Sequence, residues 1–256
     1  MTTNWDNFVE IYDWEFDLLN ESQKRDVAMW ESLCREYGPK VLEIGAGTGR
    51  ISLQLAKSGI TLTAIDNAPS FISKLKQRNI YPNLSVLVDD MLTLKSTQKF
   101  DFCFLSYSTF QYLLTREEQV KCLTSISKIL VRNGRVGFDL DPHICDLPEL
   151  NHKVLLYKEY NTEKKCFVSM FTKHKVDKVN GITSWNDEYF FHNSKNDVCT
   201  HNLSLKEISL GDMKSLFSET GFCMEAVYGG FEFEPYNDES ERMIIIAKKN
   251  KGSEEL

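Results

Sequence analysis

The fold is decided by one stretch, Lys40-Val-Leu-Glu-Ile-Gly-Ala-Gly-Thr-Gly-Arg50, in which an apolar run leads into alternate glycines. Val41, Leu42 and Ile44 form the uninterrupted apolar run that is typical of a strand covered on both faces. The glycines can adopt positive φ and let a ligand approach the backbone, and the amides of a helix over 50–58 would point at that ligand. The stretch therefore predicts a strand, a glycine turn and a helix in a nucleotide-binding geometry.

The spacing of these glycines separates two kinds of nucleotide-binding turn. A dinucleotide fingerprint needs glycine at its first, third and sixth positions, and Arg50 occupies the sixth. Here Gly45, Gly47 and Gly49 alternate, and the acid Glu43 stands two residues before the first of them. The spacing disfavours a nicotinamide-dependent oxidoreductase. That enzyme class, and a turn that only packs a helix against a strand, stay open as alternatives.

Composition and charge fit an ordinary globular enzyme. The 256 residues are 42% apolar and 12% aromatic, enough for the core of one large α/β domain or two small ones. The 37 acids against 30 lysines and arginines give a net charge of −7, which argues against a nucleic-acid partner and favours a cationic substrate. No apolar run approaches the roughly 18 residues of a membrane span, so we expect no membrane partner.

The seven cysteines are scattered along the chain and never form a C-x-x-C pair. Scattered thiols are typical of a reduced, cytoplasmic protein, and without paired spacing we expect no zinc or other metal site. The first residues, Met1–Asp6, include neither a basic segment nor an apolar run, which also favours a cytoplasmic location.

From the glycine turn onward, short apolar strands alternate with amphipathic helices, as a doubly wound α/β sheet requires. The expected strands lie at 40–45, 61–66, 84–89, 100–106 and 135–140. The expected helices lie at 50–58, 69–78 and 116–131, the last of them ended by Asn133-Gly134. A helix at 211–220 and strands at 222–228 and 242–248 would complete a seven-stranded sheet.

Two segments lie outside this block. Residues 1–39 have the pattern of an N-terminal helical segment, and residues 149–205 alternate aromatic and β-branched residues as antiparallel strands do. Asn180-Gly181 predicts a two-residue hairpin turn between two of those strands. The expected organisation is therefore a core of 40–148 and 206–250, with an antiparallel insertion after the fifth strand.

Acidic or polar residues end the strands of the core, where open α/β sheets bind ligands. Asp66 ends the second strand beside the glycine turn, where its carboxylate can accept both hydroxyls of a ribose. The third strand ends in Asp89-Asp90-Met91, whose acids fit either a ligand contact or a loop cap. Ser106-Tyr107 follows the fourth strand, and Asp141-Pro-His143 follows the fifth.

The pattern E-x-G-x-G-x-G, followed in order by Asp66, Asp90-Met91 and Ser106-Tyr107, resembles the motifs of class I S-adenosylmethionine-dependent methyltransferases. The resemblance covers residues 9–148 and implies a Rossmann-like fold that binds S-adenosyl-L-methionine, with adenine beside Asp90-Met91 and the sulfonium beside Ser106 and Tyr107. The residues that it assigns to the cofactor are Glu43, Gly45, Ala46, Gly47, Gly49, Arg50, Asp66, Asn67, Asp90, Met91 and Ser106.

Further stretches resemble a bacterial subset of that superfamily that acts on small molecules and includes amino-sugar and peptide-antibiotic N-methyltransferases. They are Val227–Tyr236 with Ser240–Met243, and Tyr12-Asp13. In the subset the tyrosine hydroxyl bonds the methionine carboxylate of the cofactor, which would assign Tyr12 to the cofactor. Phe8, Tyr12 and Phe16 also recur at helical spacing, so a packed helix face is the alternative.

Methyl transfer is an in-line displacement, so the protein must mainly align the acceptor with the methyl carbon and the sulfur in a site without water. An amine need only be neutral, whereas a hydroxyl needs a base. We expect His143 and Tyr107 to be the catalytic side chains. The side chains expected to contact the acceptor are Gln111, Glu188, Tyr189, His192, Tyr228 and Tyr236.

The sequence therefore predicts a methyltransferase of a small molecule or short peptide, with nitrogen favoured over oxygen or carbon as the acceptor atom. We expect a monomer or homodimer, in which the insertion is either a cap over the acceptor or a dimer surface. A nicotinamide-dependent oxidoreductase and a non-catalytic cofactor-binding module are the alternatives.

Overall fold

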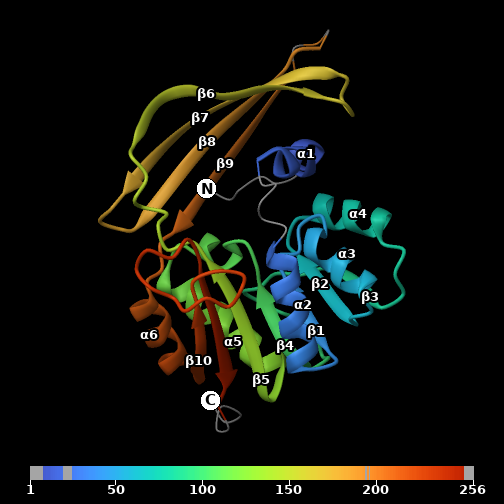
Figure 1. Ribbon diagram of the computed structural model, residues 1–256, viewed down its shortest axis with the longest axis vertical. Coiled ribbons are helices and arrows are strands. Elements are labelled where there is room, and N and C mark those ends of the chain that lie inside the picture. Colours follow the sequence, from blue (N-terminus) through green and yellow to red (C-terminus); the bar gives the residue numbers. More distant parts are fainter. Residues whose placement is uncertain (1–7, 20–24, 194, 196, 251–256) are drawn as a thin grey trace. The chain divides into compact units, whose positions relative to one another are not determined.

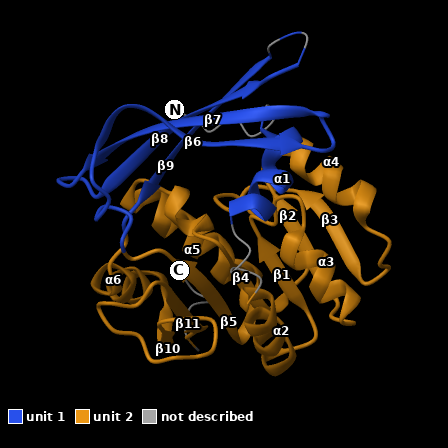
Figure 2. Ribbon diagram, turned by 45° about the horizontal axis from the view of Figure 1, so that its top comes forward, with its two compact units in different colours: residues 1–21, 143–207 blue, residues 22–142, 208–256 orange. Residues whose placement is uncertain are grey.

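The structure is a computed structural model that describes residues 8–19, 25–193, 195 and 197–250. The chain forms two compact units (Figure 2). Unit 1 contains helix α1 (Val9–Leu19) and the segment 143–207, and unit 2 contains helix α2 (Arg25–Tyr37) and the rest of the described chain. The N-terminal helical segment expected over residues 1–39 is therefore divided between the two units.

Unit 2 is built on a seven-stranded sheet (Figure 1). Its strands are β1 (Val41–Ile44), β2 (Leu62–Asp66), β3 (Leu84–Val88), β4 (Phe100–Leu105), β5 (Leu130–Leu140), β10 (Phe222–Tyr228) and β11 (Met243–Lys249). Their order is β10-β11-β5-β4-β1-β2-β3, with β1 to β5 parallel and β11 antiparallel to both of its neighbours. This confirms the predicted Rossmann-like sheet.

Helices cover both faces of this sheet, because its parallel strands are apolar on both sides. Helices α2, α3 (Arg50–Lys57) and α4 (Pro69–Arg78) pack on one face, and α5 (Arg116–Ile129) and α6 (Leu210–Thr220) pack on the other. Trp30 of α2 is fully buried and stacks on Phe104, with ring centroids 4.7 Å apart. A Cβ at Gly137 would lie 2.7 Å from the Trp30 ring, so the tryptophan packs here only against a glycine.

The start of β5 differs from the prediction. Helix α5 ends at Ile129, and Asn133, with φ of 64°, lies inside β5. Asn133-Gly134 therefore does not end the helix. The last turn of α5 has another partner that local sequence does not reveal, because the buried ammonium of Lys249 in β11 donates to the carbonyl of Ser127 at 2.8 Å.

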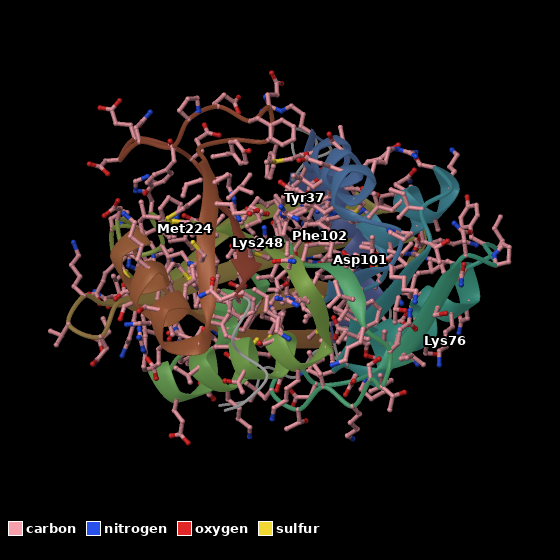
Figure 3. The ribbon with its side chains drawn as sticks, turned by 90° about the horizontal axis from the view of Figure 1, so that it is seen from below. Tyr37, Lys76, Asp101, Phe102, Met224 and Lys248 are labelled. Atoms are coloured by element: carbon pink, nitrogen blue, oxygen red, sulfur yellow. The ribbon has the colours of Figure 1, made fainter. Side chains whose placement is uncertain are left out.

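Close packing fills the amino-terminal edge of the parallel strands, which Figure 3 shows from below. The rings of Tyr37 and Phe102 lie 5.3 Å apart, and the carboxylate of Asp101 accepts a hydrogen bond from the amide of Lys40 at 3.0 Å. The opposite, carboxyl edge is the one at which the predicted site residues of the core lie.

Unit 1 consists of α1 and a four-stranded antiparallel sheet. The strands β6 (Leu150–Asn161), β7 (Cys166–Asp177), β8 (Ile182–Phe191) and β9 (Val198–Lys206) follow one another in the sheet. This confirms the predicted insertion. The turn between β7 and β8 has four residues, 178–181, rather than the two predicted, because the Asp177 carboxylate accepts the amides of Val179 and Asn180.

Helix α1 packs on one face of this sheet through an aromatic core that includes Phe8 and Tyr189. Glu15 of α1 is buried there, and its carboxylate accepts hydrogen bonds from the hydroxyls of Tyr157 at 2.8 Å and Tyr189 at 3.0 Å. His201 stacks on Phe8 with ring centroids 4.2 Å apart. The helix is therefore fixed by both apolar and polar contacts. In the described part of the chain, no helix is long and apolar enough to cross a membrane.

Glu15 should make the stability of unit 1 depend on pH. Burial raises the pKa of Glu15 from 4.5 to about 7, although the two tyrosine hydroxyls oppose the shift. Between these values folded unit 1 keeps a proton that the unfolded chain has lost. Stability should therefore fall as the pH rises through this window and stay level above it, with a total loss of at most about 3 kcal/mol.

Denaturant unfolding of unit 1 between about pH 4 and pH 8 would measure this slope. Glu15→Gln removes the charge but keeps an acceptor for a tyrosine hydroxyl, so the slope should become shallower. Asp187→Asn is the matched comparison, because burial raises the pKa of Asp187 to about 6. An unchanged slope in Glu15→Gln would contradict the prediction.

Candidate active site

The glycine turn joins β1 to α3 and is tied by its backbone to β2. The amides of Gly45 and Ala46 both donate to the carbonyl of Ile65, each at 2.9 Å. Gly45, Gly47 and Gly49 have φ of 76°, 57° and 92°, values that glycine adopts far more readily than other residues. The turn therefore has the backbone that the sequence predicts, at the carboxyl edge of the parallel strands.

Packing explains two of these glycines. A Cβ at Gly45 would lie 2.4 Å from Cγ2 of Thr109, and a Cβ at Gly49 would lie 2.1 Å from Cδ1 of Leu75. Both positions require glycine whatever the turn binds. Gly47 has a positive φ as well, and its amide donates a hydrogen bond to the carboxylate of Asp66 at 2.8 Å.

Asp66 ends β2, and its carboxylate binds the backbone of the glycine turn and of the segment that follows β2. Besides the amide of Gly47, its carboxylate accepts the amide of Ala68 at 2.9 Å. Burial raises the pKa of Asp66, and these backbone donors oppose that shift. Each carboxylate oxygen can accept a further hydrogen bond. The contact with a ribose therefore stays a prediction, beside an observed role in shaping the turn; the next residue, Asn67, is exposed.

Glu43 and Arg50, which the resemblance assigned to the cofactor, hold the helices around the turn. Glu43 is buried and accepts a hydrogen bond from the Ser52 hydroxyl in α3, and burial raises the pKa of Glu43 to about 7. Arg50 forms a two-point ion pair with the buried Asp26 of α2, with Nη1 2.7 Å from Oδ1. These side chains bind neighbouring helices because a buried charge needs a partner.

The acids after β3 shape their own loop. The carboxylate of Asp90 accepts the amide of Leu92 at 2.8 Å, and that of Asp89 accepts the amide of Asp90 at 2.9 Å. The amide of Asp89 donates to the carbonyl of Asp66 at 3.1 Å, which places this loop beside the end of β2. Met91 packs partly buried against the apolar core on the α5 side of the sheet. The loop-cap alternative is observed, and the adenine contact stays a prediction.

The end of β4 carries an unusual turn. Ser106 is buried, and the next two residues, Tyr107 and Ser108, have φ of 49° and 62° although neither is glycine. Tyr107 is 37% exposed, and its amide donates to the carboxylate of the buried Asp139 at 2.8 Å. The predicted pair Ser106-Tyr107 therefore lies at the carboxyl edge with a backbone that other residues must hold.

Gln111 has a structural role, which corrects its predicted contact with the acceptor. Its side chain is fully buried, its amide nitrogen donates to the carbonyl of Asp141 at 2.9 Å, and its amide oxygen accepts the Asp141 amide at 2.7 Å. It fastens the short helix η3 (Thr109–Tyr112) to the end of β5.

Tyr228 and Tyr236 flank a loop that folds back on itself after β10. Tyr228 forms a bridge with Pro235, and its ring lies 5.2 Å from that of Phe233. Tyr236 packs partly buried against the apolar core of unit 2, and burial raises its pKa. Their contact with an acceptor stays a prediction.

In unit 1, Tyr12 lies in a ladder of rings along α1. Its ring centroid is 5.8 Å from that of Phe8 and 6.4 Å from that of Phe16. The packed helix face is therefore observed, and the proposed bond of the Tyr12 hydroxyl to the cofactor stays a prediction.

The strand geometry of β8 corrects the prediction that Glu188, Tyr189 and His192 contact one acceptor. Tyr189 lies on the face that α1 covers, where it bonds Glu15. Glu188 lies on the opposite face and pairs with Lys153 at 2.6 Å, and His192 contacts Ser169 of that same face at 2.8 Å. Side chains on opposite faces of a sheet cannot line one site.

His143 begins the unit 1 segment and is partnered by a carboxylate. Its Nδ1 lies 2.8 Å from Oδ2 of Asp146, and its side chain is 40% exposed. An exposed imidazole beside a carboxylate suits a proton acceptor, so the predicted catalytic role of His143 remains open.

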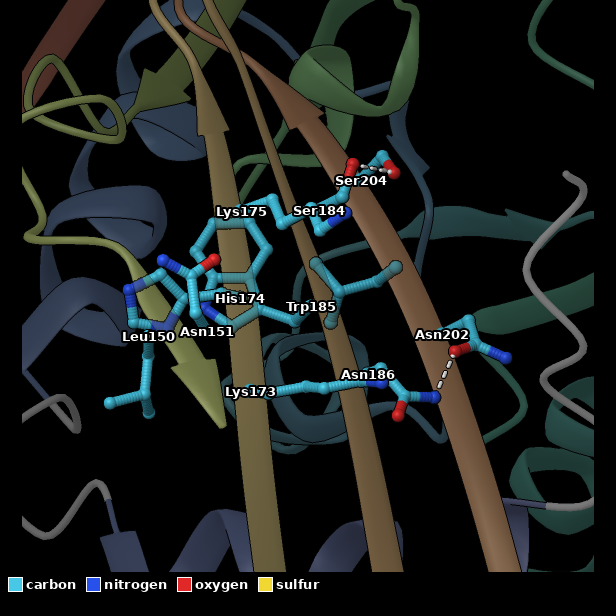
Figure 4. A pocket seen from close by; sticks show the side chains of 11 residues that line it. Leu150, Asn151, Lys173, His174, Lys175, Ser184, Trp185, Asn186, Asn202 and Ser204 are labelled. Atoms are coloured by element: carbon cyan, nitrogen blue, oxygen red, sulfur yellow. Dashed lines mark hydrogen bonds between the residues drawn. The ribbon is translucent and has the colours of Figure 1, made fainter. Parts of the chain in front are cut away.

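Unit 1 contains a cavity of about 580 Å³ that the sequence did not predict (Figure 4). Residues of all four strands β6 to β9 line it, including Leu150, His174 and Trp185. The cavity depends on which strands are neighbours in the sheet, and the alternation of side chains along one strand does not reveal that order. The sequence also did not predict the role of Arg242, which lies just before β11 and whose guanidinium pairs with Asp139 of β5.

Comparison with known proteins agrees with this geometry. Residues 41–134, which span the glycine turn and the ends of β2 to β4, match the family model described as a methyltransferase domain. The chain is 27% identical over 243 residues to the cypemycin N-terminal methyltransferase of Streptomyces sp, covering 94% of this chain and 95% of that protein.

Two solved structures share the fold. An S-adenosylmethionine-dependent methyltransferase from Clostridium acetobutylicum matches with a TM-score of 0.79 at 14% identity, covering 94% of this chain and 98% of that one. The sugar N-methyltransferase KedS8 from Streptoalloteichus sp matches with a TM-score of 0.74 at 12% identity, covering 93% and 92%. The chain therefore contains a methyltransferase domain and has the fold of S-adenosylmethionine-dependent methyltransferases.

The residues at the carboxyl edge of this methyltransferase fit S-adenosylmethionine. The Asp66 carboxylate can accept ribose hydroxyls, and the half-buried Asp90 and Met91 can meet an adenine with a polar and an apolar atom. The buried Ser106 adds a hydroxyl at the end of β4 that suits the methionine end. When bound, the cofactor supplies a methyl group activated by the positive charge of its sulfur.

Asp66→Ala should weaken binding of S-adenosylhomocysteine about ten- to hundredfold, because hydrogen bonds to a charged group contribute about 1.5–3 kcal/mol. Isothermal titration calorimetry would measure the loss. Asp101→Ala is the matched control, since Asp101 also accepts a backbone amide but at the opposite edge of the sheet. Equal affinity of Asp66→Ala and Asp101→Ala would contradict the assignment.

Tyr12→Phe separates the two roles of Tyr12, because it keeps the ring and removes the hydroxyl. If the hydroxyl binds the cofactor, affinity for S-adenosylhomocysteine should fall while the melting temperature stays the same. An affinity equal to that of the parent would leave Tyr12 as part of the helix face only.

Proposed function

We propose that this methyltransferase transfers the methyl group to an amine nitrogen of a small molecule or a short peptide. The observation that carries the proposal is the names of two similar proteins: one matched along the sequence is named as an N-terminal methyltransferase, and one matched in fold is named as a sugar N-methyltransferase. The net charge of −7 also favours a substrate that carries a positive charge before it reacts.

The chemistry needs little more than alignment. The lone pair of a neutral amine forms a bond to the methyl carbon while the carbon–sulfur bond breaks, and the electron pair of that bond stays on sulfur. The nitrogen then carries a positive charge until it releases a proton. His143, held by Asp146, is our candidate for receiving it. Tyr107 is our candidate for holding the amine at the end of β4.

We assign the choice of acceptor to the segment 149–205 and the loop from Tyr228 to Tyr236, and cofactor affinity to unit 2. The carboxylate of Glu188 would hold an ammonium form of the acceptor. Glu188 and His192 belong to one face of the unit 1 sheet, so variants at these two positions should act alike. Tyr189 belongs to the other face and serves as their comparison.

Methyl transfer from a labelled donor to paired acceptors would test the proposal. Each pair contains an amine, such as an amino sugar or a peptide with a free terminus, and the same molecule with that amine acetylated. Only the free amine should gain a methyl group, and the rate should rise with pH as the amine loses its proton. Methylation of hydroxyl groups in the acetylated partner would favour an oxygen acceptor instead.

His192→Ala and Tyr236→Ala should lower acceptor turnover but leave affinity for S-adenosylhomocysteine within about twofold, since neither contact is made to the cofactor. Tyr189→Phe removes the hydroxyl that binds Glu15 and should alter the stability of unit 1 rather than turnover. Variants that match the parent with every acceptor would remove this segment from the acceptor site.

A further inference from the structure

The turn after β4 has a backbone that its own residues do not favour. Tyr107 and Ser108 are consecutive non-glycine residues in the left-handed region, with φ of 49° and 62°. Such residues persist only where the surrounding structure fixes them, and they concentrate at functional sites. We refer to Ser106–Thr109 as the Tyr107 turn.

A buried ion pair holds this turn. Asp139, which is fully buried near the end of β5, accepts the amide of Tyr107 on its carboxylate at 2.8 Å and the amide of Ser108 on its carbonyl at 3.0 Å. The guanidinium of Arg242, just before β11, donates from Nε to the same carboxylate at 2.7 Å. A second nitrogen of Arg242 donates to the hydroxyl of Ser108 at 3.2 Å. One arginine thus contacts both the residue that holds the turn and the turn itself.

The Tyr107 turn also contacts the glycine turn. The hydroxyl of Thr109 donates to the carbonyl of Ser106 at 2.7 Å, which fixes the Thr109 side chain. A Cβ at Gly45 would lie only 2.4 Å from Cγ2 of Thr109, so the Thr109 side chain occupies the space beside this glycine. The ion pair therefore supports a turn that packs against the glycine turn through Thr109 and carries the exposed ring of Tyr107.

We propose that Arg242 and Asp139 are positioning residues for methyl transfer, which hold the Tyr107 turn so that Tyr107 is presented to the reacting groups. The inference rests on the proposed role of Tyr107 toward the acceptor. The amides of Gly45 and Ala46 are held by Ile65 instead. Of the Tyr107 turn itself, only Ser106 is assigned to the cofactor. Loss of the Arg242–Asp139 pair, which we call the clamp, should therefore affect turnover more than cofactor affinity.

Arg242→Lys tests the clamp with little risk to folding, because it keeps a positive charge beside the buried Asp139 but lacks the fork that reaches Ser108 as well. At saturating cofactor, turnover should fall about tenfold or more, with affinity for S-adenosylhomocysteine within about threefold. Adding Ser108→Gly should recover most of the turnover, since glycine adopts positive φ without a clamp. A merely structural arginine would show no such recovery.

Arg135→Lys is the matched control. Arg135 pairs with Glu225 through Nε at 2.6 Å and joins β5 to β10 in the same sheet. It should leave turnover unchanged. Full turnover in Arg242→Lys, a loss that Ser108→Gly does not recover, or an equal loss in Arg135→Lys would each overturn the proposal.

Hydrogen exchange keeps this test independent of the acceptor. The amides of Tyr107 and Ser108 should exchange faster in Arg242→Lys than in the parent, while those of β5 and β11 keep their protection. Unchanged exchange at these two amides would overturn the clamp. If the parent methylates no amine, the proposed function fails, and the exchange result still decides the clamp.

Discussion

The carboxyl edge of unit 2 depends on two hydrogen bonds to one atom. The carbonyl oxygen of Ile65 accepts both the Gly45 amide and the Ala46 amide at the start of the glycine turn. This pair of hydrogen bonds fixes the turn against β2, and the Asp66 carboxylate extends the attachment to Gly47. The glycines can then adopt positive φ while the turn stays hydrogen-bonded to β2. Every predicted cofactor residue of unit 2 is placed relative to this junction, since β1 to β4 are neighbours in one parallel sheet.

The same edge shows why several polar side chains that look like ligand contacts are structural. A buried carboxylate or guanidinium must find a partner, and a tightly packed α/β sheet offers partners on its neighbouring helices and strands. Glu43 finds Ser52, Arg50 finds Asp26, and Gln111 finds the backbone of Asp141. These contacts do not make the site less specific, because each one fixes an element that borders the glycine turn.

The sequence predicts the seven-stranded sheet well, because apolar strands buried on both faces, glycine turns and amphipathic helices are local patterns. It fails where a distant residue supplies the deciding partner. Lys249 satisfies the end of α5, and the stop expected at Asn133-Gly134 is not used. Asp139 lies within the expected fifth strand, but its pairing with Arg242 depends on β11 lying beside β5.

In unit 1, alternation along β8 correctly separates two faces but does not say which of them packs. The answer lies in α1, whose Glu15 bonds Tyr157 and Tyr189 and so selects the Tyr189 face as the covered one. The substrate contacts predicted for β8 therefore divide between a packed face and an open one, and a single-sequence pattern could not have made that division.

The two units bury acids by different physical means, and this gives them different sensitivities. In unit 2, Asp139 is neutralised by the guanidinium of Arg242, which stays charged over the whole range in which proteins fold. In unit 1, Glu15 has two hydroxyl donors that lower its pKa too little to offset burial, so the pKa is about 7. The negative charge of Glu15 is therefore removed by protonation, whereas that of Asp139 is balanced by the charge of Arg242. The packing of α1 on its sheet should therefore weaken as Glu15 ionises.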